Sequence, residues 1–104
     1  MSKTVYVYGL IDPRDGKFFY VGSTQDMNTR MYRHRMAGYS ASKEMMHRLA
    51  EIRECGKSLK FETLEECSDL SRDEIEAKWI EQLREEGYRL LNQRKPIFRI
   101  QRRY

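Results

Sequence analysis

Cysteine is scarce in this sequence, and long hydrophobic runs are missing. The cysteines, Cys55 and Cys67, form neither a CxxC pair nor a zinc-ligand pattern with a nearby histidine. We therefore expect two free thiols, as is usual in reducing compartments. No stretch is apolar and long enough to span a bilayer, and Thr4 to Leu10 is too short and tyrosine-rich for a signal peptide. These absences argue against a disulfide scaffold, a zinc site and a membrane protein, and we expect a cytoplasmic protein.

The length of the chain bounds its organisation. A chain of 104 residues has the size of one small domain and leaves little room for a separate recognition module. It contains no internal repeat, low-complexity tract or linker. We expect a single domain over residues 1–104, whose last part, about residues 93–104, is a basic segment.

Basic and acidic side chains are segregated along the chain. Lys and Arg outnumber Asp and Glu by 20 to 16, which gives a formal net charge of +4. Bases dominate from Arg30 to Arg53, acids dominate from Glu62 to Glu86, and the stretch from Arg89 to Arg103 contains no acid. Such a distribution is typical of a protein that turns one face to phosphate and another to solvent.

Two runs of β-branched and aromatic residues predict a β-hairpin. They are Thr4–Ile11 and Lys17–Gly22, and the turn between them contains Pro and an Asp-Gly pair. Because both runs are apolar on alternate sides, we expect helices on one face and a substrate or a further strand on the other. Leu59–Leu64 alternates well enough to be a third strand.

Three helices are expected around these strands, over about residues 26–37, 42–54 and 71–86. Asp26 can cap the first helix, and Ser71 to Glu74 has the spacing of a capping box for the third. Glycines at 38, 56 and 87 follow the expected helix ends. Short strands are predicted near Leu90 and over Ile97–Ile100. The fold class is therefore α+β, with a small central antiparallel three-stranded sheet flanked by helices.

One carboxylate in the third expected helix lies on its apolar side. At about 100° per residue, Ile75, Trp79, Ile80 and Leu83 form one arc, and Glu76 falls inside it. A carboxylate aimed at the core is costly unless a cation or a strong donor meets it. Three interpretations remain open: a position at the edge of the arc, a structural salt bridge, or a ligand for Mg²⁺, which commonly takes one or two carboxylates plus phosphate oxygens.

The first expected helix offers the complementary charge. Arg30 and His34 are four residues apart and therefore share a face, beside Met27 and Met31. An arginine in this position is usually a solvated surface residue or a salt-bridge partner, and the residue pattern alone does not distinguish these from a site residue.

Taken together, these residues resemble the GIY-YIG nuclease superfamily. Tyr6-Val7-Tyr8 and Tyr20-Val21-Gly22 resemble its two tripeptide motifs, and Ser23-Thr24, Arg30 and Glu76 follow in the order of the family. The similarity extends over about residues 5–92. Tyr6 stands where the family has Gly, and valine replaces isoleucine at positions 7 and 21, which keeps a β-branched strand residue.

The resemblance implies a DNA endonuclease that depends on Mg²⁺, for which Mn²⁺ could substitute. It implies catalytic roles for five residues, with Glu76 also the metal ligand, and it suggests Asn92 as a polar residue near the site. Tyr6 remains an alternative to Tyr8, because strand alternation places both phenols on the same side. The five expected catalytic residues are Tyr8, Tyr20, Arg30, His34 and Glu76.

Phosphodiester hydrolysis suggests how these roles divide. Glu76 would hold Mg²⁺ against a phosphate oxygen and the leaving group, while the planar donors of Arg30 support the phosphate. A tyrosine has a pKa near 10 and activates water at neutral pH only if cations lower that value. We expect Arg30, His34 and Mg²⁺ to do so, and His34 could accept the proton of Tyr8.

Exposed bases are expected to supply the DNA affinity, through salt-dependent and largely sequence-independent contacts with phosphates. Aromatic side chains could add stacking on bases. The expected phosphate contacts are Arg33, Arg35, Lys43, Arg48, Arg53, Arg94, Lys95, Arg99, Arg102 and Arg103, and the candidates for stacking are Tyr39, Phe98 and Tyr104.

Two other function classes remain open at this point. One is a nucleic-acid-binding module that keeps the fold without cleavage, and the other is a small scaffold that needs a protein partner. Plasmid cleavage with Mg²⁺ separates the first from a nuclease, and absence of DNA binding at low salt would indicate the second. Nicking and double-strand cleavage are both compatible with the sequence, as are homing, restriction, mobile-element interference and repair.

Overall fold

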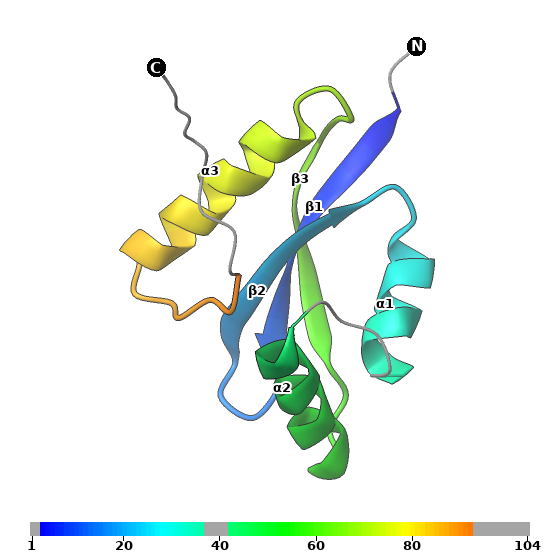
Figure 1. Ribbon diagram of the computed structural model, residues 1–104, viewed down its shortest axis with the longest axis vertical. Helices are drawn as coiled ribbons and strands as arrows, with labels where there is room; N and C mark the ends of the chain where they lie inside the picture. Colours follow the sequence, from blue (N-terminus) through cyan, green and yellow to red (C-terminus); the bar gives the residue numbers. More distant parts are fainter. Residues whose placement is uncertain (1–2, 37–41, 93–104) are drawn as a thin grey trace.

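The computed structural model describes residues 3–36 and 42–92 (Figure 1). Within these residues three strands form one antiparallel sheet in the order β2-β1-β3, so β1 is central and the other two are edge strands. Three helices in the same ranges accompany the sheet, which confirms the expected α+β class. The elements in chain order are β1 (Thr4–Asp12), β2 (Lys17–Thr24), α1 (Met27–Met36), α2 (Lys43–Glu54), β3 (Lys60–Ser68) and α3 (Arg72–Glu85).

Helices cover both faces of the sheet (Figure 1). Between the sheet and the pair α1 and α2 lies one core, whose buried members are Tyr8, Leu10, Phe19, Met31, Met45, Leu49, Ile52 and Leu59. Between the sheet and α3 lies a second core, whose buried members are Val7, Val21, Ile80 and Leu83. The expectation of a substrate or a strand on the second face is therefore wrong. The apolar arc of α3 covers that face, because an amphipathic helix must bury its apolar side.

A bulge in β2 changes which aromatic side chains share a face. Leu10 pairs with Tyr20 but Ile11 pairs with Phe18, which leaves Phe19 as an extra residue. Simple alternation would send Phe19 and Tyr20 to opposite faces. Because of the bulge, both pack against the core beside α1 and α2. The bulge thus brings Tyr20 to the α1 side of the sheet.

β3 is longer than the alternation in the sequence predicts. It continues to Ser68, whereas the expected strand ends at Leu64. The pairing register with β1 shifts between Val7 and Tyr8, opposite Leu64, which interrupts the alternation at that point. Beyond it, Glu65 accepts hydrogen bonds from the side chains of Lys78 at 2.6 Å and Trp79 at 2.8 Å. This acidic edge strand is therefore held against α3.

The helix starts agree with the sequence in position and partly in chemistry. Asp26 accepts a hydrogen bond from the backbone N–H of Thr29 at 3.1 Å, which confirms its expected capping role. The capping box predicted at Ser71 is wrong. Ser71 precedes α3, but its ψ of 9° is far from the extended conformation of a capping residue, and its hydroxyl donates to the carbonyl of Ser68 at 3.3 Å.

The segment after α3 lies along the free edge of β2 without forming a strand. The N–H of Leu91 donates to the carbonyl of Phe19 at 2.7 Å. The side chain of Asn92 donates to the carbonyl of Val21 at 2.7 Å and accepts from its N–H at 2.9 Å. The strand predicted near Leu90 is therefore wrong, because a side-chain amide replaces the backbone ladder. The strand expected over residues 97–100 and the expected end of the first helix at residues 37 and 38 lie outside the described residues.

Two expectations, about the cysteines and about membrane-spanning segments, can be compared with the structure. Both Cys55 and Cys67 are free thiols, as predicted. None of the helices within residues 3–36 and 42–92 combines the length and the apolar character needed to cross a bilayer.

Candidate active site

A buried phenol and a buried imidazole meet between β1 and α1. Tyr8 is 0% exposed and His34 is 7% exposed, and the Tyr8 hydroxyl lies 2.9 Å from Nε2 of His34. Burial raises the pKa of Tyr8 above its ordinary value and lowers the pKa of His34 to about 4. At neutral pH the phenol is therefore protonated and the imidazole neutral, and Tyr8 donates to Nε2 in the tautomer that carries the imidazole proton on Nδ1.

Contrary to expectation, the side chains around Tyr8 do not bring its pKa below the ordinary value. Burial is the largest influence and raises this pKa, and the nearby Tyr20 raises it further. The charge and hydrogen bond of Arg30 act in the opposite direction but do not outweigh burial. Tyr8 can therefore contribute to proton transfer at neutral pH only if its own proton moves to an acceptor, and Nε2 of His34 is already in place.

Tyr20 is the second phenol at this position. Its ring centroid lies 6.2 Å from that of His34, and the ring of Tyr8 lies 5.9 Å from the same imidazole. Tyr20 is only partly buried, whereas Tyr8 has no exposed surface. A ligand approaching from solvent therefore reaches Tyr20 first.

Gly22 makes the close packing of these rings possible. It pairs with Tyr8 across the sheet. A Cβ atom on Gly22 would lie 2.5 Å from the Tyr8 oxygen and 3.0 Å from Cε2 of Tyr20. Any side chain at position 22 would displace the phenols, which is a steric reason for a glycine at this position of the second motif.

Arg30 of α1 and Glu76 of α3 converge on Ser23, near the end of the edge strand β2. Nη1 of Arg30 donates to the carbonyl of Ser23 at 3.4 Å, and the Ser23 hydroxyl donates to Oε2 of Glu76 at 2.7 Å. Within residues 3–36 and 42–92, no cation lies at ion-pair distance from Glu76. The structural salt bridge is thus not formed there, and a hydroxyl donor meets the carboxylate instead.

A second arginine, Arg72, joins this group and was missed from the sequence. Its Nε donates to the Ser23 hydroxyl at 2.7 Å, and its Nη2 donates to the Ser23 carbonyl at 3.0 Å. Arg72 lies four residues before Glu76, so both project from the same side of α3. The four-residue spacing could have indicated that Arg72 lies next to Glu76. The contact with Ser23 could not be foreseen, because Ser23 lies on another element and no local pattern connects that residue to α3.

Beside Ser23 lies an open pocket of about 300 Å³ whose lining includes three arginines. They are Arg30 and Arg33 of α1 and Arg72 of α3, while Thr24 and Asp26 contribute polar groups. Planar guanidinium groups suit phosphate oxygens, because they offer paired donors together with charge. The pocket therefore has the chemistry of a phosphate site next to the two phenols.

The carboxylate of Glu76 suits a hard divalent cation such as Mg²⁺. In the described ranges no group of three or more His, Cys, Asp or Glu side chains could enclose a metal. Mg²⁺ and Mn²⁺ do not need such a cage, since Mg²⁺ commonly binds through one or two carboxylates, water and phosphate. Glu76 fits this role, because Ser23 fixes Oε2 and Oε1 accepts no hydrogen bond from the described residues.

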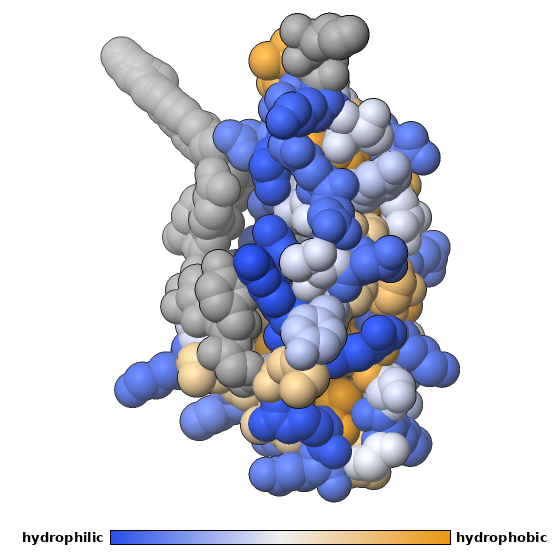
Figure 2. Space-filling model, turned by 90° about the vertical axis from the view of Figure 1, so that its right-hand side faces the viewer, coloured by the Kyte–Doolittle hydropathy of each residue, from blue (hydrophilic) through white to orange (hydrophobic). Residues whose placement is uncertain are grey.

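The other expected DNA contacts within the described ranges differ in exposure and in partners. Arg33, Arg35 and Lys43 are exposed. Arg48 is half-buried, forms an ion pair with Asp12 at 3.5 Å, and is therefore partly neutralised by the protein itself. Figure 2 shows the side of the molecule that carries α1, where hydrophilic side chains predominate and apolar ones are scattered among them.

Other expected residues lie elsewhere. Asn92, suggested near the site, holds the edge of β2 at Val21, two positions before Ser23. Arg53 donates to the carbonyl of Met36 at 3.2 Å. The remaining expected contacts lie outside the described residues, namely Arg94, Lys95, Arg99, Arg102 and Arg103 for phosphates and Tyr39, Phe98 and Tyr104 for stacking.

Two phenols, an imidazole, arginines and one carboxylate are thus gathered on and around β1 and β2 of a small α+β domain, a set of side chains suited to phosphodiester chemistry. The family model of the GIY-YIG catalytic domain matches residues 4–89. The chain therefore belongs to the GIY-YIG family, a family of nucleases. Neither a curated protein nor a solved structure gives a significant match to the chain.

Proposed function

We propose that this protein is an endonuclease that hydrolyses phosphodiester bonds of DNA with the help of Mg²⁺. The observation that carries the proposal is the convergence of three charged side chains on Ser23, namely Arg30, Arg72 and Glu76. They lie beside the buried pair of Tyr8 and His34. The arginine-lined pocket beside Ser23 favours a polyanionic substrate. Free thiols favour the cytoplasm as its location.

The charged groups divide the work around the scissile phosphate. Glu76 would hold the divalent ion, whose positive charge would stabilise the negative charge that develops during phosphodiester cleavage. Ser23 keeps the Glu76 carboxylate oriented through the 2.7 Å hydrogen bond. Arg30 and Arg33 line the pocket and would receive the phosphate with paired donors.

The phenols and the imidazole would handle the proton of the attacking water. As the new bond from water to phosphorus forms and the bond to the 3′ oxygen breaks, the water must lose a proton. Tyr20 is the phenol that solvent reaches, and it would contact this water. Nε2 of His34 would be the final acceptor: it would take the Tyr8 hydroxyl proton across their 2.9 Å contact as the phenols pass on the proton of the water, and the leaving 3′ oxygen would take a proton from solvent.

Binding of a phosphate at Arg30 would make His34 a better proton acceptor. The pKa of His34 is lowered first by burial and second by the positive charge of Arg30. A phosphate on Arg30 offsets that charge and raises the pKa of the imidazole again. The base would therefore gain strength when the substrate is bound.

Incubation of supercoiled plasmid with the protein and Mg²⁺ tests the proposal. We expect nicked or linear product, and its loss on chelation of the metal or in the variants Glu76→Ala and Arg30→Ala. Glu74→Ala is the matched control, because it removes an exposed carboxylate from the first turn of the same helix, and it should cut like the wild type.

Two outcomes would contradict the proposal. Plasmid that is bound but stays intact with Mg²⁺ and with Mn²⁺ would identify a DNA-binding module. Equal cutting by wild type and Glu76→Ala would point to a contaminating nuclease.

A further inference from the structure

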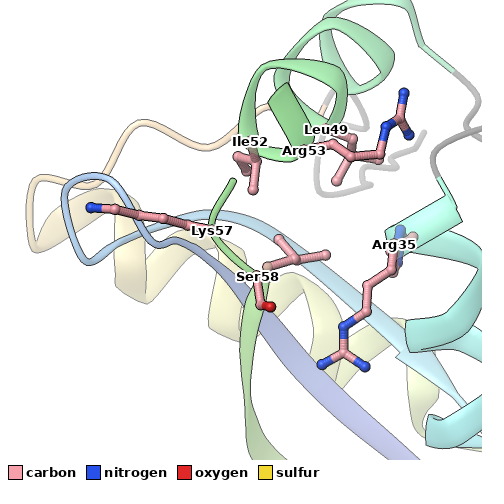
Figure 3. A pocket seen from close by; sticks show the side chains of 8 residues that line it. Arg35, Leu49, Ile52, Arg53, Lys57 and Ser58 are labelled. Atoms are coloured by element: carbon pink, nitrogen blue, oxygen red, sulfur yellow. The ribbon is translucent and has the colours of Figure 1, made fainter. Parts of the chain in front are cut away.

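A second pocket lies between the end of α1, α2 and the loop before β3 (Figure 3). Its volume is about 170 Å³. His34 lines it, which connects this pocket to the site at Tyr8, whereas Ser23, Arg72 and Glu76 take no part in it. No role in the proposed cleavage uses this pocket.

The lining combines an apolar floor with a cationic rim. Leu49, Ile52 and Leu59 form the floor and are at most 5% exposed. The cations Arg35, Arg53 and Lys57 are exposed and come from three different segments around that floor (Figure 3). No carboxylate lines this pocket in the described part of the chain. Its occupant should therefore be apolar at the centre and anionic at the edge.

A single nucleotide has this distribution of chemistry, since a flat base is joined through its sugar to a phosphate. An apolar cavity of about 150 Å³ holds one benzene molecule. A pocket of about 170 Å³ therefore has room for one base ring and none for a base pair. A base taken out of the stack is commonly held between aromatic or apolar side chains, and cationic groups hold the backbone of the unpaired strand.

The cations of the rim differ in how far the protein already uses them. Arg53 donates to the carbonyl of Met36 at 3.2 Å. Neither Arg35 nor Lys57 forms an ion pair with any residue in the described ranges. These two side chains therefore carry charge that a phosphate can neutralise. Arg35 directly follows His34 in α1, so it lies at the boundary between the two sites.

The position of the pocket relates it to the scissile phosphate. Arg30, the proposed phosphate ligand, lies four residues before His34 in α1, which corresponds to about 6 Å along the helix axis. A strand whose phosphate rests on Arg30 thus brings a neighbouring nucleotide to the end of α1. This step rests on the proposed function.

We propose that this pocket takes one unstacked nucleotide of the cleaved DNA strand, next to the scissile phosphate. The base lies on the apolar floor, and its phosphate is held by Arg35 on the α1 side of the pocket. Pulling a base out of a paired duplex costs free energy, and a base that is already unpaired avoids this cost. The protein should therefore prefer DNA in which one base is unpaired.

Binding of two labelled duplexes tests this, measured by fluorescence anisotropy in the presence of EDTA so that no cleavage occurs. One duplex is fully paired, and the other has the same sequence with a single-base bulge. We expect the wild type to bind the bulged duplex at least tenfold more tightly. Ser58→Trp, which fills the pocket from an exposed lining position, and Arg35→Ala should both bring the ratio close to one.

Lys60→Ala is the matched control, because it removes an exposed cation that does not line the pocket, and it should keep the wild-type ratio. Circular dichroism checks the fold of each variant, and Arg35→Ala decides alone if Ser58→Trp does not fold. A wild-type ratio near one, or a ratio that survives in the folded pocket variants, overturns the proposal. If plasmid is nevertheless cut, only this pocket assignment fails; if neither duplex is bound, the proposed function fails with it.

Discussion

Removing the Ser23 hydroxyl is the most direct test of how the site is assembled. This hydroxyl donates to Oε2 of Glu76 at 2.7 Å and accepts from Nε of Arg72 at 2.7 Å. Ser23→Ala deletes both hydrogen bonds, while the Ser23 carbonyl still accepts from Arg30 and Arg72. The fold should therefore survive with its arginines nearby but with an unanchored carboxylate.

The size of the effect follows from these contacts. A hydrogen bond to a charged group contributes about 1.5–3 kcal/mol when it is buried. Glu76 and Arg72 are only half-buried and can be hydrated again, so we expect the free energy of unfolding to fall by about 1–2 kcal/mol. Groups that orient a metal ligand typically change metal affinity or activity by about 10–100-fold. The Nε of Arg72 loses its acceptor in this variant, which leaves it able to pair with Glu76 four residues later and to compete with the ion.

The assay is the initial rate of plasmid nicking as a function of Mg²⁺ concentration. For Ser23→Ala we expect the Mg²⁺ concentration at half-maximal rate to rise about 10–100-fold, with a smaller loss of rate at saturating Mg²⁺. Ser23→Thr keeps a hydroxyl and should restore most of the affinity. Ser71→Ala is the matched control, because that hydroxyl donates to the carbonyl of Ser68 and not to the site. An unchanged Mg²⁺ dependence in a folded Ser23→Ala protein would refute the orienting role of Ser23.

Three further predictions concern the rings beside Ser23. Tyr8→Phe leaves the buried Nε2 of His34 without its hydrogen-bond partner, so we expect the free energy of unfolding to fall by about 1–3 kcal/mol and nicking to slow at least tenfold. Full activity of this variant would remove the phenol from the mechanism. Gly22→Ala would place Cβ 2.5 Å from the Tyr8 oxygen, so it should lower the free energy of unfolding by about 1–3 kcal/mol and abolish nicking. Gly56→Ala is the control, because its Cβ meets nothing within 4 Å, and this variant should keep its activity below its melting temperature. Burial lowers the pKa of His34 from its ordinary 6.5 to about 4 in the folded protein. Between pH 6.5 and pH 4 the unfolded chain therefore binds more protons than the folded one, and the free energy of unfolding falls by up to about 3 kcal/mol as the pH drops through this range. Melting curves over this range check the slope, and a slope of the same size in His34→Gln would contradict the assignment.

Local patterns in the sequence were sufficient for most of the fold. The hairpin, the three helices and the role of Asp26 at the start of α1 follow from alternation, helical periodicity and a capping side chain. These signals act over a few neighbouring residues, so they can be read without knowledge of the rest of the chain. The helical plot of α3 likewise singled out Glu76, because a carboxylate within an apolar arc conflicts with burial.

The tertiary structure decided how these parts become a site. The bulge at Phe19 turns Tyr20 to the face of Tyr8, and the choice of Tyr8 over Tyr6 as the partner of His34 follows from a contact between two elements. Ser23 acquires its role only because α1 and α3 flank the end of the edge strand.

Burial and an edge contact decided the remaining properties. Burial raised the pKa of Tyr8 where nearby cations were expected to lower it. Asn92 became a clamp on β2 because the backbone groups of Val21 at this edge pair with its side-chain amide. The sequence by itself determined which elements form and which charges are available. Register shifts, edge contacts and desolvation depend on residues far apart in the chain, so only the folded arrangement determined where those charges meet and how they titrate.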